Sequence, residues 1–244
     1  MRILIVNPNT TASMTRKAAL AAQAVAAPGT EIVAATSAMG PASIEGYYDG
    51  ALAVPGLLAE LKAGEAAGGQ AAVIACFDDT GLDAARAMAN IPVLGLCESA
   101  LMTASFIAQR FTVVTTQERS RLLIENLARH YGMGGRAKVR ASDIAVLDLE
   151  DAASDAQGKL RAQIERALEE DGAEAIVLGC AGMADLAHEL QAFYGVPVID
   201  GVSAAVKQAE ALVAQGLSTS KRGSYAPPLP KAYSGAMAGF APAY

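Results

Sequence analysis

Two cysteines occupy matching places in two similar halves of this chain. Cys76 follows the apolar run 71–75, and Cys180 follows the apolar run 175–179. The two cysteines are about 100 residues apart, which is the length of one small domain. Two thiols that face one cleft can remove a proton from one side of a carbon atom and return a proton to the other side. The matched pair therefore predicts racemisation without a cofactor.

The competing interpretation is that these cysteines only fill space, because a cysteine outside a disulfide is often a small buried hydrophobic residue. Packing alone gives no reason for two cysteines at equivalent positions. Cys97 has no counterpart in the second half and is predicted to lie in the core. We expect backbone N–H groups at the helix starts after Cys76 and Cys180 to hold an enolate oxygen. The same helix starts should lower the thiol pKa toward neutrality, as a general base requires.

Composition and charge exclude several classes of protein. Hydrophobic residues make up 52% of the 244 residues and aromatic residues only 5%, so Ala, Val, Ile and Leu must build most of the core. The net charge of −6 and the lack of a basic stripe argue against nucleic acid or a membrane as a partner.

Three cysteines, an odd number, argue against a disulfide framework and favour a reducing compartment. The first residues follow a strand pattern and lack the basic and apolar regions of a secretory signal. The alanine-rich stretch 18–27 is too short to span a bilayer. We therefore expect a cytoplasmic protein.

Short apolar runs alternate with longer helical patterns along the whole chain, which is typical of an α/β fold with parallel sheets. Several runs are apolar throughout, as expected for strands that helices cover on both faces. The predicted strands are 2–6, 31–35, 71–75, 91–96, 111–115, 143–147, 175–179 and 196–200.

The repeat predicts two pseudo-symmetric lobes, each a parallel sheet flanked by helices. The first α/β lobe should cover 1–97 and be completed by a returning helix at about 205–215. The second α/β lobe should cover 98–204. Residues 216–244 are rich in Gly, Ser and Pro, which predicts an irregular C-terminal tail.

Polar residues follow several strands, and ligands bind beyond the carboxyl ends of strands in open parallel sheets. Asn9 could contact a ligand or form an Asx turn that caps a helix. Thr115 and Thr116 present the same choice, since Thr116 could cap the helix that follows. Asp78 and Asp79 could be catalytic carboxylates or charges at a helix start.

Cofactor signatures are missing from the sequence. Neither histidine belongs to a metal-ligand spacing, and there is no C-x-x-C pair. No G-x-G-x-x-G follows a predicted strand, so a dinucleotide is not expected. We therefore expect neither a metal nor an organic cofactor.

At several segments the chain resembles the hydantoin racemase branch of the aspartate/glutamate racemase superfamily, a branch that includes allantoin racemases. The resemblance extends over essentially the whole chain, and the segments are specific only in combination. They are 5–11, 43–49, 75–82, 179–183 and 221–231.

The resemblance implies a two-lobed fold in which Cys76 and Cys180 are the two acid/base thiols. It also implies a small cyclic ureide as substrate, namely a 5-monosubstituted hydantoin. Separately, we expect a homo-oligomer. Together with the strand-end reasoning, the resemblance leads us to expect substrate contacts from Asn9, Ile44, Phe77, Asp78, Asp79, Thr80, Thr115, Thr116, Ala181, Gly182 and Met183.

The chain departs from the glutamate racemases of the superfamily next to both cysteines. Those enzymes usually have Asn-Thr after the first cysteine and Thr-His after the second, whereas this chain has Phe77-Asp78 and Ala181-Gly182. The groups that would hold an α-amino acid are therefore missing, which disfavours free aspartate or glutamate.

Four alternatives stay open at this point. The nearest is allantoin racemase, which has the same mechanism. A decarboxylase or a cis–trans isomerase of the superfamily is less favoured, because a decarboxylase needs only one thiol. A two-lobed binding protein would clamp a small molecule without chemistry, and the matched thiols count against it.

Overall fold

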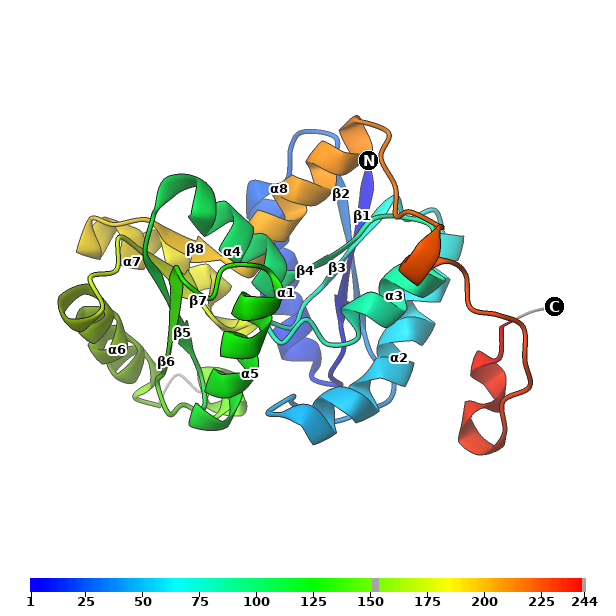
Figure 1. Ribbon diagram of the computed structural model, residues 1–244, viewed down its shortest axis with the longest axis horizontal. Helices are drawn as coiled ribbons and strands as arrows, with labels where there is room; N and C mark the ends of the chain where they lie inside the picture. Colours follow the sequence, from blue (N-terminus) through cyan, green and yellow to red (C-terminus); the bar gives the residue numbers. More distant parts are fainter. Residues whose placement is uncertain (151–153, 243–244) are drawn as a thin grey trace.

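The computed structural model describes residues 1–150 and 154–242, and it has two lobes built around separate sheets (Figure 1). Each sheet has four parallel strands. The strand order is β2-β1-β3-β4 in the first lobe and β6-β5-β7-β8 in the second. The two orders are equivalent under the repeat, so β3 corresponds to β7. This confirms the predicted fold class of two pseudo-symmetric α/β lobes.

The first lobe alternates strands and helices. Its elements are β1 (Arg2–Asn7), α1 (Ala12–Val25), β2 (Glu31–Thr36), α2 (Tyr47–Ala66), β3 (Ala71–Ile74), α3 (Leu82–Met88) and β4 (Val93–Gly95).

The second lobe repeats this alternation. Its elements are α4 (Leu96–Ile107), β5 (Phe111–Thr115), α5 (Glu118–His130), β6 (Ala137–Ala141), α6 (Ala156–Glu170), β7 (Ala175–Leu178), α7 (Ala187–Tyr194) and β8 (Val198–Asp200). Helix α8 (Gly201–Ala214) follows, and four short 3-10 segments are η1 (Val146–Glu150), η2 (Ala181–Leu186), η3 (Gly223–Tyr225) and η4 (Gly235–Phe240).

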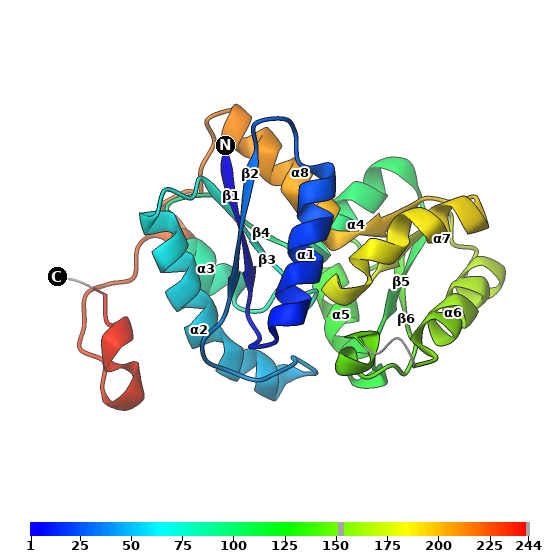
Figure 2. The same cartoon turned by 180° about the vertical axis from the view of Figure 1, so that it is seen from behind.

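One hydrophobic core joins the two lobes, because one face of each sheet packs against it. In β1, Ile3 and Ile5 point into this shared core, whereas Leu4 and Val6 point into a second core under α2 and α3. Successive side chains of a strand point to opposite faces, so a strand with a core on both sides is apolar throughout. Helices α1, α4 and α8 contribute to the shared core, and Figure 2 shows them between the sheets.

The predicted strand 143–147 is wrong, and the edge strand of the second sheet is β6 (Ala137–Ala141). Lys138 and Arg140 alternate with apolar residues in β6, as is common in an edge strand. The segment therefore contains no continuous apolar run that would predict a strand. Ile144 and Val146 gave 143–147 its apolar character because they are buried, yet their backbone leaves the sheet.

Helix α8 returns to the first lobe after the second sheet is complete. It packs against α1, α4, β3 and β4. Within the described residues, the chain beyond α8 has no strand and no α-helix. The division into lobes at residues 97 and 204 stays a prediction. No helix among the described residues is both long enough and apolar enough to cross a membrane.

Candidate active site

The two thiols at the ends of equivalent strands line one small cavity. Cys76 follows the end of β3, and Cys180 follows the end of β7. The cavity has a volume of about 50 Å3. The two sulfur atoms are close enough for a charge on Cys180 to raise the pKa of the Cys76 thiol. All three cysteines are reduced thiols, and Cys97 is fully buried in α4.

Most of the residues predicted from the sequence meet at this cavity, from both lobes. Its lining contains Asn9, Ile44, Cys76, Phe77, Asp78, Thr115, Thr116, Cys180, Ala181 and Gly182. Five lining residues were not predicted, and they are Met14, Ala75, Ser120, Val146 and Gly179.

The surroundings of Cys76 raise its pKa, contrary to the sequence-based expectation. Burial raises the pKa of the Cys76 thiol well above its ordinary value, and the negative charge of Asp78 raises it further. The Thr80 hydroxyl donates to Sγ at 3.3 Å, and this opposes the increase. The expected effect of a helix N-terminus is absent because α3 begins only at Leu82, beyond an intervening turn.

Asp78 lines the cavity beside Cys76. Burial and the neighbouring Asp79 raise the pKa of Asp78 to about 7. Its carboxylate accepts no hydrogen bond from the described part of the chain, because its only hydrogen-bonding contact there is the backbone bond to Cys76. Its raised pKa lies close to neutral pH, so this carboxyl group can exchange a proton or accept a hydrogen bond.

Asp79 points away from the cavity, although the sequence predicted that it contacts substrate. Its two carboxylate oxygens accept the backbone N–H groups of Cys97 and Glu98 at 2.9 Å each, at the start of α4. It also accepts a hydrogen bond from the Tyr131 hydroxyl at 2.7 Å. Burial raises the pKa of Asp79 to about 6. A φ of +47° turns its side chain toward α4, so Asp79 fixes the loop that carries Cys76.

Asn9 fits both interpretations that the sequence left open. Its Oδ1 accepts the backbone N–H of Thr11 at 2.9 Å and the side-chain amide of Asn7 at 2.9 Å, which fixes the turn before α1. Its Nδ2 donates to the Met14 sulfur at 3.3 Å and lies at the cavity. A thioether is a weak acceptor, so the Asn9 amide can turn its hydrogen atoms toward a ligand.

Thr115, the last residue of β5, and Thr116, the next residue, differ in their use. The Thr115 hydroxyl donates to the Gly179 carbonyl at 3.2 Å and joins β5 to β7. Thr116 is buried at the cavity, and α5 is capped at Gln117 rather than at Thr116. Thr116 is therefore placed to contact a ligand, whereas Thr115 holds the backbone.

On the second lobe, Cys180 is the first residue before the 3-10 segment η2. The first N–H groups of a helical segment have no partner within it, and Ala181 and Gly182, the first two residues of η2, both line the cavity. Met183 follows them but is fully buried, with its side chain in the outer core of the second lobe. Its apolar side chain goes to that core because the segment turns inward after Gly182.

The unpredicted lining residues come from three places. Ala75 and Gly179 directly follow β3 and β7, and the other three lie in first helical turns or in the segment 143–147. Met14 and Ser120 lie in the first turns of α1 and α5, where a helix start after a strand end brings them to the cavity. Val146 lies in the segment that was predicted to be a strand. The sequence signal for Met14 and Ser120 is a helix that starts directly after a polar strand end.

Glu45 joins the two lobes over the cavity. Its Oε2 accepts a hydrogen bond from the Gln117 side chain at 2.9 Å, and its Oε1 accepts the Val146 N–H at 3.3 Å. The neighbouring Ile44 lines the cavity and is buried. In residues 1–150 and 154–242, no group of three or more His, Cys, Asp or Glu is arranged to hold a metal ion.

The fold and the site define a two-lobed α/β protein with paired thiols at the ends of equivalent parallel strands. Residues 3–209 match the family described as Asp/Glu/Hydantoin racemase. The chain belongs to this family, as the sequence predicted, and it is an isomerase of the racemase type.

Known relatives support this assignment along the whole chain. A curated hydantoin racemase from Rhizobium meliloti is 52% identical and is matched over 96% of this chain and 98% of its own length. The structure of an allantoin racemase from Klebsiella pneumoniae is 48% identical and covers 99% of each chain, with a TM-score of 0.96. A glutamate racemase from Francisella tularensis, at 16% identity, covers 93% of this chain and 85% of its own, with a TM-score of 0.65, and shows the fold alone.

Proposed function

We propose that this protein racemises 5-monosubstituted hydantoins without a cofactor, with Cys76 and Cys180 as opposed acid/base groups. The observation that carries the proposal is the meeting of these two thiols at one cavity between the lobes. The 52% identity to the hydantoin racemase of Rhizobium meliloti supports the substrate class. One thiolate removes the proton from C5, and the opposite thiol protonates the other face of the carbon.

The hydantoin ring favours this reaction, because C5 lies between a carbonyl carbon and a nitrogen atom and the enolate spreads onto the carbonyl oxygen. In this proposal the backbone N–H groups of Ala181 and Gly182, which line the cavity, stabilise that oxygen. Each such donor contributes about 3 kcal/mol to the transition state in acyl-transfer enzymes.

The raised pKa of Cys76 bears on the direction of proton transfer. Burial keeps Cys76 in the thiol form, which is the form that donates a proton. Catalysis in the reverse direction requires the Cys76 thiolate. The hydrogen bonds from Thr80 and from the Asp78 backbone favour that anion.

Allantoin racemase is the second candidate. It uses the same chemistry, and the solved allantoin racemase from Klebsiella pneumoniae is 48% identical to this chain. Decarboxylation is less supported, since a second thiol at the cavity would have no role in it.

Proton NMR in D2O tests the proposal directly. Optically pure L-5-benzylhydantoin and (S)-allantoin are incubated separately with the enzyme, and loss of the C5 proton signal is followed together with optical rotation. We expect exchange and loss of rotation with benzylhydantoin. Exchange no faster than in buffer for both compounds would overturn the proposal.

We also propose a homo-oligomer in a reducing, cytoplasmic compartment. The reducing environment is supported by the need for Cys76 and Cys180 as thiols. The oligomer is supported by residues 226–240, which we call the arm and which extend away from the first lobe in Figures 1 and 2.

The arm differs sharply from the segment before it. Before the arm, the Thr219 hydroxyl, the Lys221 ammonium and the Tyr225 hydroxyl bond to the first lobe at 2.7–2.8 Å. In the arm, Leu229 is 77% exposed and Met237 is 43% exposed. An apolar segment in water gains free energy by packing on another surface, which a second copy of the chain supplies.

A further inference from the structure

The thiol cavity is too small to enclose a hydantoin ring together with a large substituent at C5. Its volume is about 50 Å3, whereas a cavity of about 150 Å3 holds a single benzene molecule. An aromatic or branched substituent must therefore extend out of the cavity while C5 stays between the two sulfur atoms.

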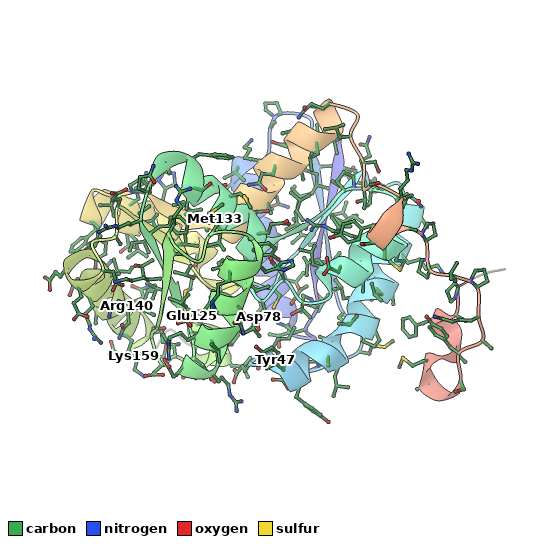
Figure 3. The ribbon with its side chains drawn as sticks, viewed as in Figure 1. Tyr47, Asp78, Glu125, Met133, Arg140 and Lys159 are labelled. Atoms are coloured by element: carbon green, nitrogen blue, oxygen red, sulfur yellow. The ribbon has the colours of Figure 1, made fainter. Side chains whose placement is uncertain are left out.

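A larger cavity borders the thiol cavity at Asp78, and we call it the outer chamber. Its volume is about 440 Å3. Asp78 lines both spaces. Figure 3 shows Asp78 and Tyr47 between α5 and the start of α2. The floor of the outer chamber is the loop 78–81, which directly follows Cys76.

The walls of the outer chamber are apolar and come from both lobes. Ala51 and Val54 line it from α2, and Leu123 and Leu127 line it from α5. The polar lining residues of α5, Asn126 and His130, are exposed to solvent and therefore lie at the rim of the chamber. A group that enters between the two helices therefore leaves water for hydrocarbon on both sides.

Resting on the hydantoin racemase activity, we propose that the outer chamber binds the C5 substituent and selects uncharged apolar substituents larger than methyl. An aromatic or aliphatic substituent that packs against Leu123, Leu127 and Val54 buries apolar surface, which makes the free energy of binding more favourable. These three side chains give the ureido group of allantoin no hydrogen bond, and burying that group against them costs free energy. The Asp78 carboxylate at the entrance repels an anionic substituent.

Another cavity, of about 410 Å3, borders the thiol cavity at Gly182. Its lining includes the charged side chains of Lys17, Asp148, Asp155 and Asp185. Desolvating those charges against a benzyl or isobutyl group is unfavourable. The outer chamber is therefore the better site for apolar substituents.

Filling the outer chamber tests the proposal. Ala51 lies on the exposed surface of α2 and lines the chamber, so Ala51→Leu adds bulk there without disturbing the core. We expect kcat/KM for L-5-benzylhydantoin to fall about tenfold, and kcat/KM for L-5-methylhydantoin to change less than about twofold. Optical rotation gives both rates.

The matched control is Ala63→Leu, because Ala63 is an exposed alanine of the same helix and does not line the chamber. It should leave both kcat/KM values unchanged. Equal effects of Ala51→Leu on the two hydantoins, or no effect on benzylhydantoin, would overturn the subsite. A wild-type enzyme that prefers (S)-allantoin to benzylhydantoin would overturn the selectivity. Failure to racemise any hydantoin would instead contradict the proposed function.

Discussion

The hydroxyl of Tyr131, just beyond the end of α5, donates a hydrogen bond of 2.7 Å to Asp79, three residues after Cys76. The same carboxylate accepts the first N–H groups of α4, from Cys97 and Glu98. A single buried side chain thus ties the Cys76 loop of the first lobe to two helices of the second. The position of one thiol relative to the other depends on this connection.

Tyr131→Phe should destabilise the protein, because the buried Asp79 carboxylate loses a charge-assisted hydrogen bond. We expect the free energy of unfolding at pH 8 to fall by about 1.5–3 kcal/mol. The bond lowers the pKa of Asp79, so its contribution is largest when Asp79 is ionised and declines as the pH falls through about 6. Urea denaturation at pH 8 and pH 5 measures both effects.

Tyr48→Phe provides the control, since Tyr48 is 78% exposed on α2. It should unfold at the same urea concentration as the wild type. A Tyr131→Phe variant as stable as the wild type at pH 8 would show that Asp79 does not need this bond.

Asp78→Asn should stabilise the protein at alkaline pH. The ordinary pKa of an aspartate is 3.8, and that of Asp78 in the fold is raised to about 7. Between these values the native state binds more protons than the unfolded state, so the contribution of Asp78 to stability falls as the pH rises through this range. We expect the variant to gain about 2 kcal/mol or more over the wild type at pH 8, and less at pH 5.

Urea denaturation across pH 4–8 checks this pH dependence. Asp185→Asn is a suitable control, because Asp185 is exposed and does not line the thiol cavity. Equal stability of Asp78→Asn and the wild type at pH 8 would show that the buried charge of Asp78 costs nothing.

The position of the two thiols could be predicted because it depends only on residues that are neighbours in the sequence. An apolar run that ends in cysteine, repeated after one domain length, places Cys76 and Cys180 at the same edge of two parallel sheets. The polar ends of β1 and β5 follow from the same rule, which brought Asn9 and Thr116 into the lining.

The role of Asp79 could not be predicted, because it depends on a backbone turn and on a distant partner. Its φ of +47° is uncommon for a residue other than glycine, and no local pattern announces it. Its partner Tyr131 is far along the chain and belongs to the other lobe. The prediction of a lowered pKa for Cys76 was wrong because it also depends on the three-dimensional surroundings. Burial raises this pKa, and the nearest helix start lies too far away to lower it.

Single cysteine variants should separate the two proton transfers. Cys76→Ala and Cys180→Ala should each lower racemisation of L-5-benzylhydantoin by about a thousandfold or more, since each lacks one of the two acid/base groups. Each variant should still exchange the C5 proton of one enantiomer in D2O, and the two variants should prefer opposite enantiomers. Proton NMR on the separate D and L substrates measures this preference.

Cys97→Ala is the internal control, because Cys97 is fully buried in the core and does not line the cavity. It should retain racemisation even if its stability falls. Full activity in either Cys76→Ala or Cys180→Ala would rule out a mechanism with two thiols.

Removal of the arm should lower the oligomeric state. A chain that ends at Ala226 keeps Tyr225 and its 2.8 Å hydrogen bond to Asp83, so the first lobe stays intact. We expect light scattering after size-exclusion chromatography to give a smaller molar mass for this chain than for the full chain. Leu229→Asp should act in the same direction, because Leu229 is 77% exposed in a single copy and packs on the partner in the proposed oligomer. Ser234→Asp also adds a charge to the arm, but at a polar residue, and it should leave the molar mass unchanged. Equal molar mass for the full and truncated chains would show that the arm does not hold copies together.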